Sequence, residues 1–315
     1  MFALAIHGGA GTIRRADITP ERDAALRAGL REALEAGRRV LAADGSALDA
    51  VVAAVAALED NPLFNAGKGG TFNDEGVIEL EAAVMEGHTR DAGSVTGVRR
   101  TRNPVHLARE VMRHTPHVTL GFEAADRFAA ARGLAQEEAA YFHTAQRHEA
   151  LLAELARLKA GGSDADVDEQ TKHGTVGAVA LEALGRLAAA TSTGGRTAKM
   201  AGRVGDTPII GAGTWADDGV AVSGTGHGEF FVRAAVGHEV SSRMRYLGEG
   251  LGAAAEAVVM GDLVRMGGTG GIIAIDRLGQ ISMPFNCEGM YRASLDAQGH
   301  VTVAIYRDGE DTPLA

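Results

Sequence analysis

The sequence predicts an α+β fold in which two antiparallel sheets lie between outer helical layers. Helical patterns dominate the first half of the 315 residues, and several short strand patterns separated by turns begin at residue 175. Two more helices and two hairpins complete the chain. This order is awkward for a parallel sheet built from alternating strands and helices. It suits two antiparallel sheets that are covered by helices, an αββα arrangement.

The N-terminal half is expected to supply one strand, then mainly helices. A short buried strand over 2–6 ends in the loop HGGAG. A helix over 20–43 has Thr19 as its cap and Pro20 in its first turn, and both are favourable at a helix start. Ser46 caps a second helix that is apolar nearly all round, which indicates burial between layers. Paired strands at 77–85 and 92–98 follow, with helices at 104–113, 121–132 and 146–159.

The second half carries most of the strand patterns. Four short apolar runs separated by turn residues predict an antiparallel meander, and they cover 175–181, 187–193, 209–215 and 220–225. Helices are expected over 229–240 and 250–266. Two hairpins then pair 271–275 with 281–284 and 291–295 with 301–306. No internal repeat is evident, so residues 1–315 are expected to form a single domain.

The bulk composition limits the partners. A net charge of −10 and a pI near 5.6 argue against binding to nucleic acid, which needs a basic surface. No run of about 18 apolar residues predicts a membrane span. The N-terminus has no basic flank of a secretory signal, and the single Cys287 cannot form an internal disulfide, so a cytoplasmic location is expected. The 43 glycines are clustered, which indicates tight loops that bring backbone amides near a ligand.

One junction is chemically informative. A polar, acidic stretch over 161–173 ends at Gly174, and a β-branched apolar run begins abruptly at Thr175. The first part is typical of an exposed loop and the second of a buried strand. A threonine at a new N-terminus would carry an α-amino group that serves as its own general base. By itself, however, a threonine in this place more often begins an ordinary strand, so other residues must support the catalytic interpretation.

Small polar residues gather at four further loops and strand ends. They are HGGAG at 7–11, TSTGGR at 191–196, GRVGDTPIIGAG at 202–213 and SGTGHGE at 223–229. Each alone suits a tight turn. Together with Thr175 they supply a nucleophile, a base, oxyanion donors and a charged clamp, which are the parts that acyl transfer requires. By contrast, GKG at 67–69 lacks the rest of a phosphate loop, and the scattered histidines predict no transition-metal site.

These motifs, with LEDNPLFNAGKG at 58–69 and MPFNCEGM at 283–290, make the chain similar to the plant-type L-asparaginase and isoaspartyl peptidase family of N-terminal-nucleophile hydrolases. The resemblance extends from His7 to about Arg292. It implies a four-layer αββα sandwich and autoproteolysis between Gly174 and Thr175. Cleavage there would give an α subunit of residues 1–174, ending in a flexible linker over 161–174, and a β subunit of residues 175–315.

The resemblance also implies the catalytic residues. Thr175 is expected to be the nucleophile both in self-cleavage and in substrate hydrolysis. Thr193 is expected to orient it, and Thr225 with the Gly226 amide to form the oxyanion hole. Gly174 suits the scissile position, because glycine adopts strained backbone geometry at low steric cost. No cofactor is expected for catalysis.

Substrate and ion binding follow in the same way. Arg203 matches the position that binds the α-carboxylate of a β-aspartyl unit, and Asp206 matches the position that binds its ammonium group. In each pair the charges are opposite, and a guanidinium binds a carboxylate through two parallel hydrogen bonds. Gly226 and Asn65 are expected beside the substrate. The resemblance further implies a structural sodium ion held by main-chain oxygens of Leu58, Glu59, Asn61, Phe64, Ala66 and Lys68. It also implies a homo-oligomer, a dimer of αβ units.

The sequence therefore predicts an autoprocessing hydrolase of isoaspartyl dipeptides and L-asparagine that releases L-aspartate. A glycosylasparaginase is the alternative enzyme, although those proteins carry Asp where this chain has Gly174. An uncleaved, inactive binding protein is the alternative outside enzymes. Such a protein would have no need for Thr175, Thr193, Arg203 and Asp206 together. His227, beside the oxyanion glycine, either changes substrate preference or faces solvent.

Overall fold

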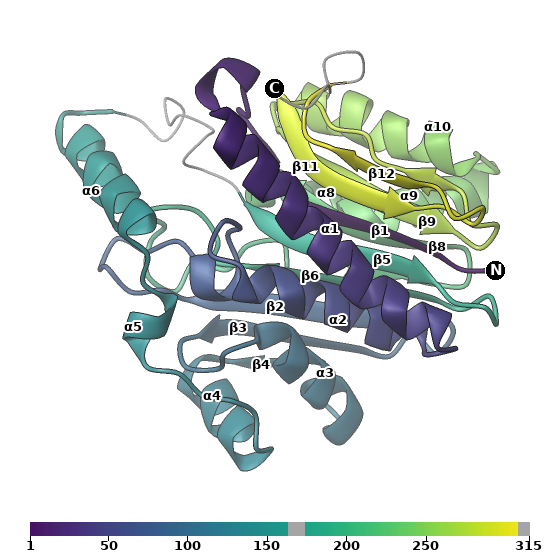
Figure 1. The fold of residues 1–315 in the computed structure, drawn as a ribbon, viewed down its shortest axis with the longest axis horizontal. Coiled ribbons are helices and arrows are strands. Elements are labelled where there is room, and N and C mark those ends of the chain that lie inside the picture. The colour runs from purple at the N-terminus through teal and green to yellow at the C-terminus, as the bar shows by residue number, and fades with distance from the viewer. Residues whose placement is uncertain (163–173, 308–315) are drawn as a thin grey trace.

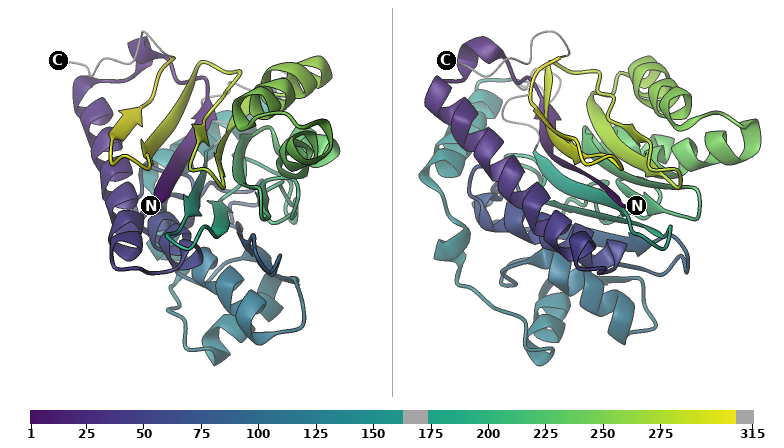
Figure 2. Two further views of the ribbon diagram at one scale, coloured as in Figure 1. Left: turned by 90° about the vertical axis from the view of Figure 1, so that its right-hand side faces the viewer. Right: turned by 45° about the vertical axis from the view of Figure 1, so that its right-hand side comes forward.

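The computed structural model describes residues 1–162 and 174–307, and it contains an eight-stranded and a four-stranded sheet that pack against each other between helices (Figure 1). In the turned views the long N-terminal helix lies on one side of the sheets and the helices of the C-terminal half lie on the other (Figure 2). The predicted α+β sandwich with four layers is confirmed.

The large sheet has the strand order β12-β11-β1-β5-β6-β2-β3-β4. Its neighbours pair antiparallel, apart from the parallel pair β3–β4. The strands are β1 (Ala3–Gly11), β2 (Leu80–Glu86), β3 (Ala92–Val98), β4 (Thr119–Gly121), β5 (Thr175–Leu181), β6 (Leu187–Thr193), β11 (Gly289–Leu295) and β12 (Val301–Ala304).

The small sheet has the order β10-β9-β8-β7 and is antiparallel throughout. Its strands are β7 (Thr214–Ala216), β8 (Val220–Gly226), β9 (Gly270–Asp276) and β10 (Ile281–Ser282). β8 and β9 of this sheet contact β5 and β1 of the large sheet. The first residues of β5 and the last residues of β8 therefore belong to two layers that face each other.

Helices cover both outer faces. The large sheet is covered by α1 (Pro20–Ala42), α2 (Ala47–Asp60), α3 (Pro104–His114) and α4 (Phe122–Ala131), and α5 (Ala139–Phe142) and α6 (Ala145–Lys159) follow. The small sheet is covered by α8 (Gly228–Ala234), α9 (Val236–Leu247) and α10 (Leu251–Glu256), the last continuing through a π-helical segment, Ala257–Leu263, into α11 (Val264–Met266). Short 3-10 turns lie at Arg15–Asp17 and Gly67–Gly69.

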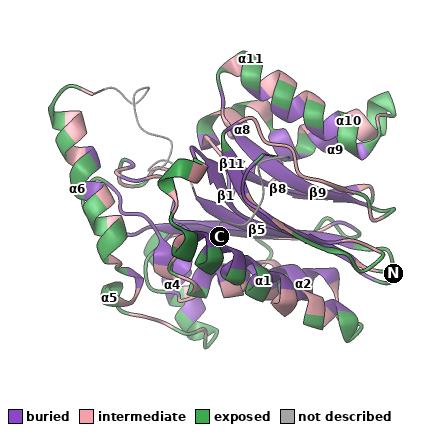
Figure 3. Ribbon diagram, turned by 45° about the horizontal axis from the view of Figure 1, so that its top comes forward, coloured by how far each residue is buried: buried purple, intermediate pink, exposed green. Residues whose placement is uncertain are grey.

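Local signals explain why these elements begin where they do. The Thr19 hydroxyl accepts a hydrogen bond from the Arg22 amide, and the Ser46 hydroxyl accepts one from the Asp49 amide, so both predicted caps are confirmed. Apart from β4, β10 and β12, the strands are buried along most of their length, whereas α1 and α6 carry both buried and exposed positions (Figure 3). None of the helices in the described part of the chain combines the length and the apolar character needed to cross a bilayer.

Two hydrophobic cores separate the layers. One lies between α1, α2, α3 and the large sheet and includes Leu30, Val55 and Ile6. The other lies between the two sheets and beneath α9 and α10, and it includes Val179 and Ile273. Each fully buried aliphatic side chain stabilises the fold by about 1.5–3 kcal/mol. Because α2 packs against several strands of the large sheet, it is apolar nearly all round, as predicted.

The predicted four-stranded meander is wrong. β5 and β6 belong to the large sheet, where β5 pairs with both β1 and β6, whereas β7 and β8 belong to the small sheet. A turn pattern between two runs does not reveal that the chain changes sheet there. The strand expected over 209–215 is also wrong in its first part. There the Ile209 and Gly213 amides donate to the Asp206 carbonyl, which forms turns, and only Thr214–Ala216 is extended.

Two boundaries also differ. The first strand continues through HGGAG to Gly11, with an irregularity in its pairing with β11 between His7 and Gly9, so this segment is strand and not loop. The helix expected over 229–240 is divided into α8 and α9 by Ala235, whose φ is 48°. Both differences arise from tertiary contacts, since glycine-rich strands and left-handed alanines have no strong local signal.

Candidate active site

Five of the predicted site residues line one small cavity at the edge between the two sheets. Thr175 begins β5 and Thr193 ends β6, and the two lie opposite each other in the antiparallel register. Gly226 ends β8 of the facing sheet, and Arg203 and Asp206 approach from the loop after β6. The cavity volume is only about 10 Å³, roughly one water molecule, so the continuous chain has no room for a substrate here.

Hydroxyl groups surround the Gly174–Thr175 bond. The Thr175 hydroxyl donates to the Thr193 Oγ1 atom at 3.2 Å, and the Thr193 hydroxyl donates to the Gly174 carbonyl oxygen, also at 3.2 Å. The Gly195 amide donates to Thr193 Oγ1 at 2.9 Å. The Thr193 hydroxyl therefore lies between Thr175, the predicted nucleophile, and the Gly174 carbonyl group, which Thr175 would attack.

His7 contacts the main chain of Thr175 and is a site residue that the sequence interpretation missed. Its Nδ1 atom lies 2.9 Å from the Thr175 carbonyl oxygen, and its Nε2 atom lies 2.9 Å from Ser223 Oγ. Burial lowers the pKa of His7 to about 3, so the ring is neutral and carries one N–H. The sequence signal is that His7 begins HGGAG, a segment singled out for its small residues, and its partner at residue 223 cannot be inferred from spacing.

The charged side chains beside the cavity include a second residue that was missed. Arg203 donates two hydrogen bonds to Glu229, from Nε to Oε1 and from Nη2 to Oε2, each at 3.0 Å. Glu229 is half-exposed at the start of α8. One edge of the guanidinium that the resemblance assigns to a substrate carboxylate thus already holds a carboxylate from this chain. The geometry shows that this edge fits a carboxylate as a two-pronged fork.

Asp206 is buried beside this pair. Its Oδ2 atom has no hydrogen-bond partner within the described residues. Burial raises the pKa of Asp206 to about 7, although the Arg203 charge acts in the opposite direction. A buried carboxylate oxygen without a partner costs free energy unless a ligand satisfies it. The orphaned oxygen, in the wall of the same cavity as Thr175, makes Asp206 suitable for binding an ammonium group.

The predicted oxyanion residues lie at the end of β8. Thr225 is fully buried, and its Oγ1 accepts a hydrogen bond from the Ala10 amide at 3.2 Å, which leaves its own O–H as a donor. Gly226 lines the cavity, and a Cβ atom there would collide with the Thr269 carbonyl oxygen, so only glycine fits. His227 is half-buried and lies 3.5 Å from Glu229, so it does not simply face solvent.

Asn65 does not line the cavity with Thr175, but it shapes the neighbouring loop. Its side-chain amide donates to the Gly195 carbonyl oxygen at 2.6 Å, and its carbonyl oxygen accepts from the Thr71 amide at 2.9 Å. A Cβ atom on Gly174 would lie within 2.7 Å of Asn65 Cβ. Asn65 is thus packed against the predicted cleavage site and holds the loop after Thr193.

The loop predicted to bind sodium folds tightly around its own carbonyl groups. A Cβ atom on Gly67 would collide with the Glu59 carbonyl oxygen, and one on Gly69 would collide with the Phe64 carbonyl oxygen. The carbonyl oxygens of Leu58, Asn61 and Ala66 each accept one backbone N–H and keep a second lone pair. Main-chain oxygens at such a closed turn fit a hard cation. Within the described residues, no cluster of His, Cys, Asp or Glu forms a metal site.

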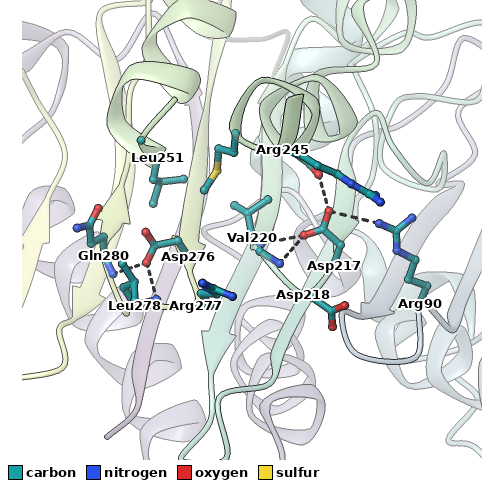
Figure 4. A pocket seen from close by; sticks show the side chains of 14 residues that line it. Arg90, Asp217, Asp218, Val220, Arg245, Leu251, Asp276, Arg277, Leu278 and Gln280 are labelled. Atoms are coloured by element: carbon teal, nitrogen blue, oxygen red, sulfur yellow. Dashed lines mark hydrogen bonds and ion pairs between the residues drawn. The ribbon is translucent and has the colours of Figure 1, made fainter. Parts of the chain in front are cut away.

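A larger pocket lies at the opposite ends of β8 and β9, away from Gly226 (Figure 4). Two of its carboxylates, Asp217 and Asp276, have structural partners. Asp217 accepts hydrogen bonds from the Gly219 and Val220 amides, and Asp276 accepts them from the Leu278 and Gln280 amides. These acidic groups stabilise turns, so the pocket does not resemble a reactive site.

Comparison with known proteins agrees with this geometry. The asparaginase family model matches residues 1–305, nearly the whole chain. The isoaspartyl peptidase of Escherichia coli (strain K12) is 48% identical, with 98% of this chain and 97% of that protein covered. The isoaspartyl peptidase/L-asparaginase of Xenopus laevis is 40% identical over 99% of this chain and 97% of its own. The plant-type L-asparaginase of Thermococcus kodakarensis is 39% identical over 100% and 99%. The chain therefore belongs to the asparaginase family and is a hydrolase.

Proposed function

We propose that this hydrolase cleaves its own chain before Thr175 and then hydrolyses β-aspartyl dipeptides and L-asparagine, releasing L-aspartate. The observation that carries the proposal is the shared cavity of Thr175, Arg203 and Asp206, which combines a hydroxyl nucleophile with groups of both charges. The names of relatives that match along almost their full length support the same substrates.

Self-cleavage would begin with attack of Thr175 Oγ on the carbonyl carbon of Gly174. The Thr193 hydroxyl, which donates to the Gly174 carbonyl oxygen, stabilises the negative charge that develops there. The bond between the carbonyl carbon and the Thr175 nitrogen then breaks as that nitrogen takes up the proton that Oγ loses on attack, which leaves an ester on Oγ and a free amine. Water hydrolyses the ester, giving a Gly174 carboxylate and a free α-amino group on Thr175.

In substrate hydrolysis the new α-amino group would accept the Oγ proton, because its reference pKa of about 7.7–8.0 lies near neutrality. Oγ attacks the side-chain carbonyl carbon of the aspartyl unit, and the oxyanion faces the Thr225 hydroxyl and Gly226. The tetrahedral intermediate collapses, and the departing nitrogen takes a proton from the protonated α-amino group of Thr175. Water then hydrolyses the aspartyl ester and regenerates Thr175.

Substrate selection would depend on two opposite charges. The α-carboxylate of the aspartyl unit binds the Arg203 guanidinium, either beside Glu229 or in its place. The α-ammonium group binds Asp206, whose Oδ2 atom has no partner within the described residues. Both groups belong to the free amino-acid end of a β-aspartyl unit, so an ordinary α-linked aspartyl residue inside a peptide would not satisfy them.

The direct test combines processing with activity on the wild-type protein. We expect two bands of about 18 and 15 kDa in denaturing electrophoresis, the shares of 32.6 kDa carried by 174 and 141 of the 315 residues. We also expect release of aspartate from β-aspartyl-leucine and from L-asparagine. A persistent single band without either activity would contradict the proposal.

The clamp also predicts a pH dependence. Below a pKa of about 7 Asp206 is protonated and neutral, and above it the carboxylate is ionised and binds an ammonium group. We therefore expect the KM for β-aspartyl-leucine to fall as pH rises from 5.5 to 8, while kcat follows the Thr175 α-amino group. In Asp206→Asn the KM should be high and should not change over this range. Initial rates at several pH values check this, and a wild-type KM that is constant across pH 7 would refute the role of Asp206.

We further propose that the loop from Leu58 to Lys68 holds a sodium ion on its main-chain oxygens. The close approach of the loop's carbonyl oxygens to Gly67 and Gly69 supports this proposal. An ion bound there would stabilise the position of Asn65, which lies within the same loop. The ion's contribution would be structural, and sodium analysis of the dialysed protein measures how much of the site is occupied.

We also propose that the protein assembles as a dimer of αβ units.

A further inference from the structure

A second pocket lies on the other side of the predicted cleavage site. Its volume is about 350 Å³, and it is enclosed by the loop after β1, the start of α1 and the start of α6. Gly174 and Asn65 form part of its wall, so it adjoins the scissile bond. It shares no residue with the cavity that contains Arg203 and Asp206.

The proposed hydrolysis determines which side of Thr175 the leaving group occupies. The departing nitrogen takes its proton from the α-amino group of Thr175, so it must lie within hydrogen-bond distance of that group. In the uncleaved chain the same nitrogen atom is bonded to Gly174. A leaving group beside this nitrogen therefore occupies the Gly174 side, where the second pocket begins.

The pocket lining carries more positive than negative charge, with Arg14, Arg22 and Arg147 against one carboxylate, that of Asp17. Arg147 Nε donates to the Gly69 carbonyl oxygen at 2.8 Å, and Arg22 Nη2 donates to Gln146 Oε1 at 3.4 Å, so both acceptors are neutral. In residues 1–162 and 174–307 neither arginine forms an ion pair with a carboxylate. Arg14, in the same wall, is paired with Glu288 at 2.8 Å.

Arg147 stays charged at neutral pH although it is buried close to Arg22. Burial, with a smaller effect of Arg22, lowers the pKa of Arg147 to about 10, so the guanidinium is still charged at neutral pH. Two like charges facing one pocket repel each other, and an anion between them would relieve that repulsion. A carboxylate suits two guanidinium groups because each presents a planar array of donors.

We propose that Arg22 and Arg147 form a subsite for the α-carboxylate of the amino acid that leaves from a β-aspartyl dipeptide. This inference rests on the proposed function and adds a determinant of substrate choice. L-Asparagine releases ammonia, which has no carboxylate, so it gains nothing from the subsite. Arg22 and Arg147 would therefore favour dipeptides over asparagine, whereas Arg203 and Asp206 act on both substrates.

The test compares three substrates that share the aspartyl unit. β-Aspartyl-leucine carries the leaving-group carboxylate, β-aspartyl-leucinamide replaces it with a neutral amide, and L-asparagine lacks it. In Arg22→Gln and Arg147→Gln we expect kcat/KM for β-aspartyl-leucine to fall about 10- to 100-fold, the range for a lost charge-assisted hydrogen bond. The other two substrates should stay within about twofold of wild type. Arg147→Lys should recover part of the loss, because it restores the charge.

Controls separate this role from a structural one. Arg31→Gln changes an exposed arginine on α1 and should alter none of the three rates. All rates are normalised to the cleaved fraction seen in electrophoresis. Equal losses on all three substrates would show that Arg147 acts only by bracing the Gly69 loop, and unchanged rates would show that no subsite exists. Either outcome overturns the inference while the wild-type activity stands, whereas a wild type inactive on all three substrates contradicts the proposed function itself.

Discussion

Thr175→Ala is expected to remain a single band of about 33 kDa and to lose essentially all hydrolase activity, by about 10,000-fold or more. The substitution removes the hydroxyl that lies 3.2 Å from Thr193 Oγ1, and with it the attacking atom in both reactions. It also prevents formation of the α-amino group that would serve as the base. Because the two losses have one cause, cleavage and turnover should disappear together. Electrophoresis and aspartate release measure them separately.

Thr175→Ser is the matched control, since it keeps the hydroxyl and loses one methyl group. We expect slower but complete cleavage, followed by measurable activity. Circular dichroism and thermal melting should show that Thr175→Ala is folded, because the side chain it shortens is small and lies at the start of β5. Two bands from Thr175→Ala would mean that another residue, or a contaminating protease, cuts the chain.

Arg203→Ala is expected to cleave itself normally but to lose kcat/KM by about 100-fold or more on both β-aspartyl-leucine and L-asparagine. Removing one partner of a hydrogen-bonded charge pair at a binding site costs about 2–5 kcal/mol. Self-cleavage needs no clamp, because the scissile bond is already held in the chain beside Thr175. The loss should appear mainly in KM, since Arg203 contacts the substrate away from the reacting carbon.

Arg203→Lys provides the comparison, because it keeps the charge but not the fork that Glu229 accepts at two positions. We expect an intermediate loss. Thermal melting of Arg203→Ala controls for the unpaired Glu229, which is half-exposed and so should destabilise the fold little. Saturation kinetics on each processed variant give the two constants. An unchanged KM in Arg203→Ala would show that the substrate carboxylate binds elsewhere.

Much of the fold could be predicted because its signals are local. The bounds of β5 and β6 agree with the predicted runs at 175–181 and 187–193, and α1 and α2 begin at the predicted caps. Hydroxyl caps and apolar alternation act over a few residues, so a single sequence reveals them. The final two hairpins are confirmed for the same reason, since each closes over a short turn.

Features that depend on distant residues could not be predicted from spacing. The assignment of β7 and β8 to a second sheet depends on how Val222 pairs with Ala274, more than fifty residues away. His7 and Glu229 join the site through partners at residues 223 and 203. Both residues lie in segments that the sequence singles out, HGGAG and SGTGHGE, but nothing local indicates their partners, because buried histidines and helix-terminal glutamates are common in proteins.

The sequence by itself determined the α+β class, the start of a buried strand at Thr175 and the set of hydroxyl, acidic and basic residues that amide hydrolysis needs. These are properties of short segments and of residue chemistry. Only the tertiary structure decided that Thr193 lies between Thr175 and the Gly174 carbonyl, that Glu229 pairs with Arg203, and that Arg22 and Arg147 share a pocket beside Gly174. The reason is physical: strand register and layer packing bring distant residues together, and a hydrogen bond depends on their separation in space.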